Sequence, residues 1–525
     1  MNIRELIETT ARKNAKKIFL YFADLEVSYE EFDRNVNRAA NVFLELGIKK
    51  GDRVCFFLPN SPEFIYGWLG LAKIGAVLVP INTNYRTEEA KYIVNHSEAN
   101  TILVHSSLND VVEKIRPETP LLKNYLYLGE DIHNRDYIDF TKALDGSTTA
   151  LMTVDISEED ICEIMYTSGT TGPSKGVIMT HKYCILAGYG YRYAMAVTPD
   201  DRLFTCLPFF HANAQAYSTM GALTSEASLI VVKKFSASRF WDQIRQYRAT
   251  LFNYIGAMLT ILSKQPESDR ERDHHVRAAY GTPAFDREFQ DYMENRYGIT
   301  LVSGYGLTEC AFGLIQPLHG LRKAKSLGLP KQIPDAGFVN AVKIVNENEE
   351  AVPPGTVGEI VIRNPAVMKG YFKEPELTQK AIRDGWLYTG DQGWMDGDGY
   401  FFFSDRKKDV IRRRGENVSS IEVESVINAH EKVLESAVIG VPSELHDDDI
   451  KAFVMLKPNQ TLEPLELVKW CKDRLAYFKI PRYIEFRTEF PKTPTHRVEK
   501  YKLKAEQKDP ARDCFDLEKT DFKLR

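Results

Sequence analysis

A short stretch of the chain, TSGTTGPSKG at residues 167–176, gathers glycines, hydroxyl side chains and one lysine directly after the strand-like residues EIMY. Glycines let a backbone approach a polyanion closely, while the hydroxyls, the backbone N–H groups and Lys175 supply donors and positive charge. The stretch does not match the Walker pattern GxxxxGK[ST], because a glycine follows Lys175. We therefore predict a phosphate-binding loop that is not a Walker loop.

Further motifs follow in a fixed order along the chain: GYGLTE (304–309), YTGD (388–391), DRKKDVIRRRGENVSSIEVE (405–424) and PKTPTHRVEKYKLK (491–504). With this set, nearly the whole chain resembles the adenylate-forming superfamily of acyl-CoA synthetases, nonribosomal-peptide adenylation domains and luciferases. The stretches GWLGLAKIGAVLVPINTNY and FSASRFWDQIRQYRAT look most similar to carnitine/crotonobetaine-CoA ligase-like enzymes. The resemblance implies an ATP-dependent ligase that adenylates a carboxylic acid, releases pyrophosphate, and passes the acyl group to coenzyme A with release of AMP.

The resemblance also implies roles in a nucleotide site. It puts Tyr305 against the adenine ring and Asp391 on the ribose, where a carboxylate can accept a hydrogen bond from each hydroxyl of a diol. Thr308 is expected to contact phosphate, and Thr170 and Glu309 are expected to hold Mg²⁺, which prefers hard oxygen ligands. The full set of residues implied to bind ATP or AMP is Thr167, Ser168, Gly169, Thr170, Thr171, Gly172, Lys175, Gly281, Thr282, Pro283, Gly304, Tyr305, Gly306, Thr308, Asp391 and Arg406.

The second half-reaction needs a movable lid in this superfamily. The resemblance puts the hinge at Lys408, and it puts Gly415 and Glu416 along the tunnel that admits the thiol. His211, in LPFFHANAQ, falls where the superfamily carries a histidine or an aromatic residue at the mouth of the acyl pocket. The residues implied to be catalytic are Lys175, His211, Thr308, Glu309, Arg497 and Lys500.

The chain departs from the superfamily near its C-terminus. The usual pattern P-K-T-x-x-G-K ends on a lysine that binds the attacking carboxylate and the α-phosphate, but here residues 491–497 read PKTPTHR. Arginine keeps the charge but is planar and bulkier than an ammonium, so it is not a simple replacement. Three alternatives stay open: Arg497 does the work of the lysine, Lys500 does it from a shifted loop, or adenylation proceeds with weaker assistance from the lid.

Other functions are alternatives to that of an acyl-CoA synthetase. One is an adenylate-forming enzyme with a carrier-protein thiol as the acceptor, or with the oxygen chemistry of a luciferase, and another is a non-catalytic nucleotide-binding relative. The acid itself is not determined by the sequence. We expect its pocket in parts of 209–217, 252–260 and 303–312, where Phe210 and Tyr217 are among the apolar residues and few charges appear, so a short or medium acyl chain is expected. The resemblance to carnitine/crotonobetaine-CoA ligase-like enzymes suggests a small charged acid instead.

The elements that must position these residues are those of an α/β protein. Residues 28–49 predict a helix behind a capping serine and GDRVCFFLPN a buried strand; PEFIYGWLGLAKIG followed by AVLVPIN repeats this pattern. Such alternation predicts layered α/β architecture with largely parallel sheets. From about residue 340 short strands and tight turns predict a β-rich subdomain, and the basic run 406–417 is typical of a linker or mobile loop.

With the resemblance, these elements imply a large N-terminal AMP-binding domain of several subdomains (1–405), a hinge (406–410) and a small mobile α+β lid (411–525). At 525 residues the chain is too long for one core, and 43% hydrophobic residues suffice to build several. A net charge of −5 gives no reason to expect nucleic acid as a partner. Seven scattered cysteines without CxxC pairs, and an opening stretch that predicts an amphipathic helix and not a signal peptide, suggest a reducing cytoplasm. We expect no membrane span, and a homodimer is among the states left open.

Overall fold

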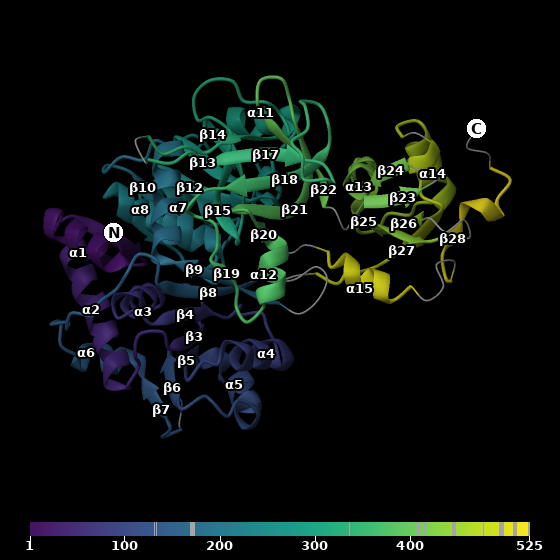
Figure 1. The fold of residues 1–525 in the computed structure, drawn as a ribbon. Coiled ribbons are helices and arrows are strands. Elements are labelled where there is room, and N and C mark those ends of the chain that lie inside the picture. The colour runs from purple at the N-terminus through teal and green to yellow at the C-terminus, as the bar shows by residue number, and fades with distance from the viewer. Residues whose placement is uncertain are drawn as a thin grey trace.

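The computed structural model of the chain consists of a large body and a smaller C-terminal body beside it, drawn in yellow-green at the right of Figure 1. It describes residues 1–130, 132, 134–167, 174–334, 337–406, 410–413, 416–443, 448–475, 477–492, 498–507 and 512–522. At residues 405, 406, 410, 412, 416, 417, 419 and 478 it describes the backbone alone.

Among the described residues, the large body contains one sheet of fourteen strands that runs from its N-terminal part to its β-rich part. Strands β1, β11, β10, β12, β13 and β14 pair in parallel, and the strands from β15 to β22 pair antiparallel. The strands are β1 (Ile18–Phe22), β2 (Leu25–Ser28), β10 (Arg202–Thr205), β11 (Ser228–Val231), β12 (Leu251–Ile255), β13 (Ala278–Thr282), β14 (Thr300–Leu307), β15 (Cys310–Ile315), β16 (Ser326–Pro330), β17 (Ala341–Val345), β18 (Gly358–Arg363), β20 (Ile382–Arg383), β21 (Trp386–Met395) and β22 (Phe401–Arg406).

A second sheet of eight strands carries the phosphate loop motif. Its order is β19-β9-β8-β4-β3-β5-β6-β7, with parallel pairing from β8 to β7 and antiparallel pairing of β8 with β9. The strands are β3 (Arg53–Phe57), β4 (Val77–Pro80), β5 (Thr101–His105), β6 (Asn124–Leu128), β7 (Tyr137–Asp139), β8 (Ile161–Thr167), β9 (Lys175–Thr180) and β19 (Gly370–Tyr371). The expected layered α/β fold with largely parallel sheets and a β-rich part is confirmed.

Helices connect and cover these sheets. The Ser28 side chain accepts a hydrogen bond from the Glu31 backbone N–H and caps α2, as its position before the apolar pattern predicted. The helices of the large body are α1 (Ile3–Lys13), α2 (Tyr29–Glu45), α3 (Pro62–Lys73), α4 (Thr87–Ser97), α5 (Asn109–Ile115), α6 (Phe140–Gly146), α7 (His181–Ala194), α8 (Met220–Ser225), α9 (Phe240–Gln246), α10 (Gly256–Ser263), α11 (Arg287–Tyr297) and α12 (Pro375–Ala381), with a π-helical segment η3 (Asn213–Thr219) before α8. The apolar helix α3 is buried, and its Lys73 pairs with Asp33 inside the protein. Across the described residues, no helix is both long enough and apolar enough to span a membrane.

The C-terminal body has hydrophobic cores of its own, as the predicted separate lid requires. Its elements are β23 (Val410–Arg413), β24 (Glu416–Ser419), α13 (Ser420–Asn428), β25 (Val433–Pro442), β26 (Asp448–Leu456), α14 (Pro464–Lys472), β27 (Tyr483–Phe486), α15 (Lys500–Ala505) and β28 (Phe515–Asp516). One expectation needs correction, because part of the basic run 406–417 is not a loop: Val410–Arg413 pairs antiparallel with Glu416–Ser419. The apolar residues Ile411 and Val418 are buried in the lid core, which explains why this part forms a hairpin.

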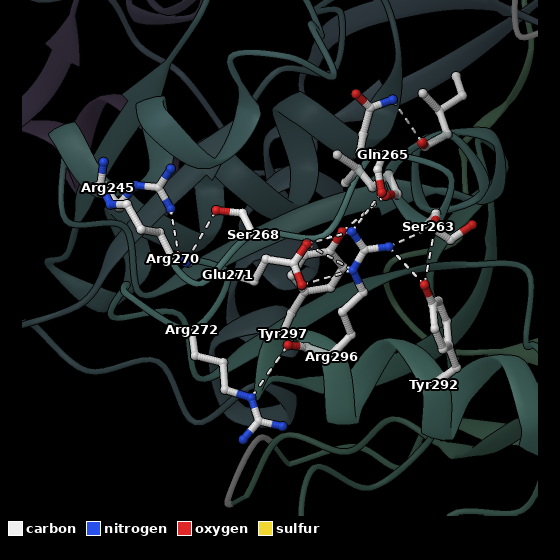
Figure 2. A network of polar contacts seen from close by, with 12 residues as sticks. Arg245, Ser263, Gln265, Ser268, Arg270, Glu271, Arg272, Tyr292, Arg296 and Tyr297 are labelled. Carbon is white, nitrogen blue, oxygen red and sulfur yellow. Dashed lines mark hydrogen bonds and ion pairs between the residues drawn. The ribbon is translucent and has the colours of Figure 1, made fainter.

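A polar network joins the end of α10 and the charged segment after it to α11 (Figure 2). Arg296, at the end of α11, donates from Nε to both carboxylate oxygens of Glu271 at 3.0 Å, and from its terminal nitrogens to the carbonyls of Ser263 and Gln265 at 2.8 Å. Both side chains are largely buried, at 5% and 14% exposed, so these charge-assisted bonds are not exposed surface contacts. They fasten the charged segment between α10 and β13, and β13 ends at Thr282.

Candidate functional site

The loop expected to bind phosphate is framed by an antiparallel hairpin. Residue Thr167, the last of β8, is the register partner of Lys175, the first of β9, so the two ends of the loop lie opposite each other. The Tyr92 hydroxyl donates to the Ser174 carbonyl at 3.0 Å and fixes the end of the loop that precedes Lys175. Five of the predicted phosphate-binding residues lie outside the described residues: Ser168, Gly169, Thr170, Thr171 and Gly172.

Lys175 and Glu309 meet at a residue that the motifs did not single out, Tyr371 of the short strand β19. The Tyr371 hydroxyl donates to Glu309 Oε1 at 2.8 Å, and Lys175 Nζ lies 5.2 Å from the centroid of the Tyr371 ring. Burial, and then the neighbouring Glu309 carboxylate, raise the pKa of Tyr371, so this hydroxyl stays protonated and remains a donor. Strand β19 pairs with β9, which is why Tyr371 lies beside Lys175.

A buried tyrosine forms hydrogen bonds with the backbone of the turn that carries Thr308 and Glu309. Tyr183 of α7 donates its hydroxyl proton to the Thr308 carbonyl at 2.9 Å and accepts from the Ala311 backbone N–H at 3.0 Å. The Glu309 carbonyl accepts from the backbone N–H of Met368 at 2.8 Å. These bonds fix the backbone of the turn, and the side chains of Thr308 and Glu309 are half-exposed.

The predicted adenine and ribose residues are in direct contact. The Tyr305 hydroxyl donates to Asp391 Oδ2 at 2.7 Å, and Asp391 is only 3% exposed. Asp391 in β21 is the register partner of Arg406 in β22, so the sheet pairing places the two ribose candidates side by side on neighbouring strands. The Asp391 backbone N–H donates to Thr389 Oγ1 at 3.1 Å, which orients the YTGD turn.

Three glycines of the site lie where a side chain has no room. A Cβ on Gly304 would come within 2.5 Å of the Tyr280 hydroxyl, and a Cβ on Gly306 would come within 2.8 Å of the Tyr217 hydroxyl. A Cβ on Gly281 would collide with the Tyr254 carbonyl. Gly281 and Thr282 end β13 beside Gly304 of β14, since Gly281 is the register partner of Ser303. Thr282 and Pro283 are exposed, as an edge that contacts a ligand must be.

His211 follows a turn that is tied to the strand of the phosphate loop. Its ring packs against Phe210 at a centroid distance of 4.7 Å. Nearby, Gln215 donates from Nε2 to the Phe209 carbonyl at 2.6 Å and to Glu163 Oε1 at 2.9 Å. Glu163 lies in β8 and is 1% exposed, and burial raises its pKa to about 8. A protonated glutamic acid thus joins β8 to the segment 209–215, part of which is expected to line the acyl pocket.

The lid residues are only partly described. Arg497, Lys408 and Gly415 lie outside the described residues, and Glu416 is described by its backbone, which pairs with Arg413. Lys500 is described, and its ammonium lies 2.8 Å from Glu424 Oε1 and 2.7 Å from Ser420 Oγ.

Sequence reasoning missed Tyr371 and Tyr183. The residues GYF at 370–372 carry no chemical signal of their own, and only the pairing of β19 with β9 brings Tyr371 to Glu309. Tyr183 lies in α7, outside every motif identified in the sequence. His274 stacks on Trp241 with 4.8 Å between the ring centroids, while its neighbour His275 is exposed.

Comparison with known proteins identifies the family of the chain. Residues 7–372 match the family described as AMP-binding enzyme, and residues 422–497 match the AMP-binding enzyme C-terminal domain. The chain belongs to the AMP-binding enzyme family, the adenylate-forming superfamily that its motifs resemble.

Relatives over the full length are CoA ligases. A crotonobetaine/carnitine–CoA ligase of Salmonella agona (strain SL483) is 36% identical over 516 residues, covering 96% of this chain and 99% of the relative. Among solved structures, the anthranilate CoA ligase AuaEII in complex with anthranoyl-AMP is 28% identical with a TM-score of 0.86, over 96% and 97% of the two chains. ATP-bound MatB from Rhodopseudomonas palustris is 28% identical with a TM-score of 0.87, over 97% and 99%. Similarity of this extent assigns the chain to the AMP-forming acyl-CoA ligases.

Proposed function

We propose that Lys175, Thr308, Glu309, Tyr305 and Asp391 form one site in which the chain activates its acid, and that ATP is the co-substrate held there. The contact of Tyr305 with Asp391 is the observation that carries this proposal. It joins an aromatic ring suited to a purine to a carboxylate suited to a ribose diol, on two strands that are far apart in sequence. Gly281, Thr282 and Pro283 would line the base, and Arg406 would support the ribose.

Phosphate binding falls to the other half of the site. Lys175 brings an ammonium to the end of the loop, and Thr308 offers a hydroxyl from the turn that Tyr183 holds. The acid's carboxylate attacks the α-phosphorus, the bond to the pyrophosphate leaving group breaks, and the charge that develops needs fixed cations and donors. In this chain, the proposed cation is Lys175 at the start of β9, and the proposed donor is Thr308 in the turn between β14 and β15.

Mg²⁺ fits the donor set. The Glu309 carboxylate supplies hard oxygens and is oriented by Tyr371, and Thr170 is the second proposed ligand. No group of three histidine, cysteine or acidic residues suited to a metal occurs in the described part of the chain, and Mg²⁺ needs none, because it usually takes one or two carboxylates with substrate phosphates and water. When bound, the ion would neutralise charge on the phosphates.

For the lid cation, we infer that Arg497 takes the role of the missing lysine. The ammonium of Lys500 is engaged by Glu424 and Ser420 inside the lid, so it would have to give up a half-buried ion pair to reach a substrate. Arginine can bind a carboxylate or a phosphate through two parallel hydrogen bonds.

The acyl group then passes to the thiol of CoA, with Gly415 and Glu416 beside the thiol's path and Lys408 as the hinge. Strand β22 of the large body ends at Arg406 and strand β23 of the lid begins at Val410, which supports domain limits of 1–405 and 411–525 around a hinge at 406–410. A carrier-protein thiol is the alternative acceptor. We also propose that the compartment is a reducing cytoplasm, since the cysteines are scattered and form no disulfide in the described part of the chain. A homodimer is a candidate assembly.

The test is a pair of measurements on the purified chain with a panel of carboxylic acids. Acid-dependent exchange of labelled pyrophosphate into ATP reports adenylation, and AMP release that requires CoA reports transfer. Exchange without any response to CoA, but with a response to a thiolated carrier protein, would replace CoA by the carrier. Absence of exchange with every acid would support a non-catalytic nucleotide-binding relative instead.

A further inference from the structure

A buried lysine lies beside the stretches expected to line the acid pocket. Lys331 follows strand β16, is 1% exposed, and is anchored by its backbone N–H, which donates to the Gly313 carbonyl at 3.0 Å. Its ammonium donates to the Tyr280 hydroxyl at 3.2 Å and to the Ala311 carbonyl at 3.4 Å.

The surroundings of this ammonium are polar but neutral. Nζ lies 4.6 Å from the ring centroid of Tyr217 and 5.1 Å from that of Tyr280, so two aromatic faces flank it. Within the described residues, no carboxylate forms an ion pair with Lys331. Burying an unpaired charge is costly, and protein interiors normally supply an anion to such a group. Among the described residues, the ammonium contacts a hydroxyl, a carbonyl and two aromatic rings.

The position of Lys331 relative to the proposed reaction centre is defined by shared neighbours. The Tyr217 hydroxyl donates to the same Ala311 carbonyl at 2.7 Å, and a Cβ on Gly306 would lie 2.8 Å from that hydroxyl. Gly306 precedes Thr308 by two residues, and Ala311 follows it by three. The ammonium is therefore close to the backbone that carries the adenylation residues and to Tyr217 of η3, which belongs to a stretch expected to line the acid pocket.

We propose, on the basis of the proposed function, that Lys331 binds an anionic group at the far end of the acid substrate, and that this ligase activates a short dicarboxylic acid. One carboxylate reacts with ATP, and the other forms a charge-assisted hydrogen bond with Lys331, with the Tyr280 hydroxyl beside it. Such a pair would supply an anion to a buried ammonium that has none among the residues that the structure describes. The same ammonium repels an acid whose far end carries a quaternary ammonium group, because like charges in a buried site are strongly unfavourable.

The experiment compares acids of equal length with and without the second carboxylate: succinate with butyrate, glutarate with pentanoate, and adipate with hexanoate, with 4-(trimethylammonio)butanoate as the cationic probe. We expect kcat/KM for AMP formation to be at least tenfold higher for the preferred diacid than for its matched monoacid, and lowest for the cationic acid. Lys331→Met should lower kcat/KM for the diacid by about a hundredfold while the monoacid changes less than threefold. Lys343→Met is the matched control, because that lysine also lies over an aromatic ring, Trp386, but in the β-rich part.

The wild-type comparison stands even if Lys331→Met fails to fold, which thermal melting would reveal. Equal or better use of monoacids by the wild type, or an equal loss for both acids in a folded Lys331→Met, overturns the dicarboxylate inference and leaves the ligase function intact. Absence of AMP formation and of pyrophosphate exchange with every acid of the panel contradicts both the inference and the proposed function.

Discussion

Replacing Tyr371 by phenylalanine removes one hydroxyl from the site and leaves the aromatic ring beside Lys175. The lost bond is the 2.8 Å hydrogen bond to Glu309 Oε1. Hydrogen bonds to charged groups contribute about 1.5–3 kcal/mol. Both Tyr371 and Glu309 are half-buried, so water can replace part of this bond, and we expect a loss near the lower end of the range. Since about 1.4 kcal/mol corresponds to a factor of ten, Tyr371→Phe should lower kcat/KM for ATP in pyrophosphate exchange about tenfold.

The loss should depend on Mg²⁺, because the hydroxyl acts through the proposed metal ligand. Pyrophosphate exchange is measured over a titration of Mg²⁺, and the defect of Tyr371→Phe should shrink as the concentration of Mg²⁺ rises. Tyr137→Phe is the matched control, since its hydroxyl donates to Glu113 Oε1 at 2.7 Å far along the chain from these motifs. Wild-type exchange by Tyr371→Phe at every Mg²⁺ concentration would refute the positioning of Glu309 by Tyr371.

Three further predictions concern the lid, the core and the ribose contact. Arg497→Ala should reduce pyrophosphate exchange at least a hundredfold, while Lys500→Ala, which breaks the ion pair with Glu424, should mainly lower the melting temperature; the reverse pattern would make Lys500 the lid cation. Burial raises the pKa of Glu163 from 4.5 to about 8, so between these values the unfolded chain releases a proton that the folded chain keeps, and stability falls as the pH rises. Glu163→Gln should flatten this dependence, measured by urea unfolding at pH 5.5 and 8; an unchanged slope would mean that Glu163 is already ionised in the fold. Asp391→Asn should raise KM for ATP at least tenfold, and an unaltered KM would contradict the ribose assignment.

Much of the fold was predictable because local patterns and tertiary packing agree. The capping Ser28, the apolar periodicity of α2 and the buried strands all predict the elements that form. The hairpin at 410–419 was not predicted, since its basic residues dominate the composition. Its strands form because Ile411 and Val418, which lie opposite each other in the two strands, are buried in the lid core.

Site residues that belong to a sequence motif were predictable, and site residues that strand pairing brings together were not. Asp391 and Tyr305 belong to motifs, and their contact follows from the fold. Tyr371 and Lys331 carry no motif that marks them. Tyr371 reaches Glu309 only because β19 pairs with β9, and Lys331 reaches Ala311 only because the chain crosses back beside β15 after β16. Such long-range pairings are set by packing over the whole domain, which a local pattern does not contain.

The central claim is that the acid's own carboxylate attacks ATP and that CoA then takes the acyl group. It is tested most directly with an acid whose carboxylate oxygens are both labelled with ¹⁸O, in the presence of ATP and CoA. The attacking oxygen stays on the α-phosphorus when the thiol displaces AMP from the acyl carbon, so mass spectrometry should find one ¹⁸O atom in each AMP released. Unlabelled AMP, or the formation of ADP and phosphate in place of AMP and pyrophosphate, would contradict the account.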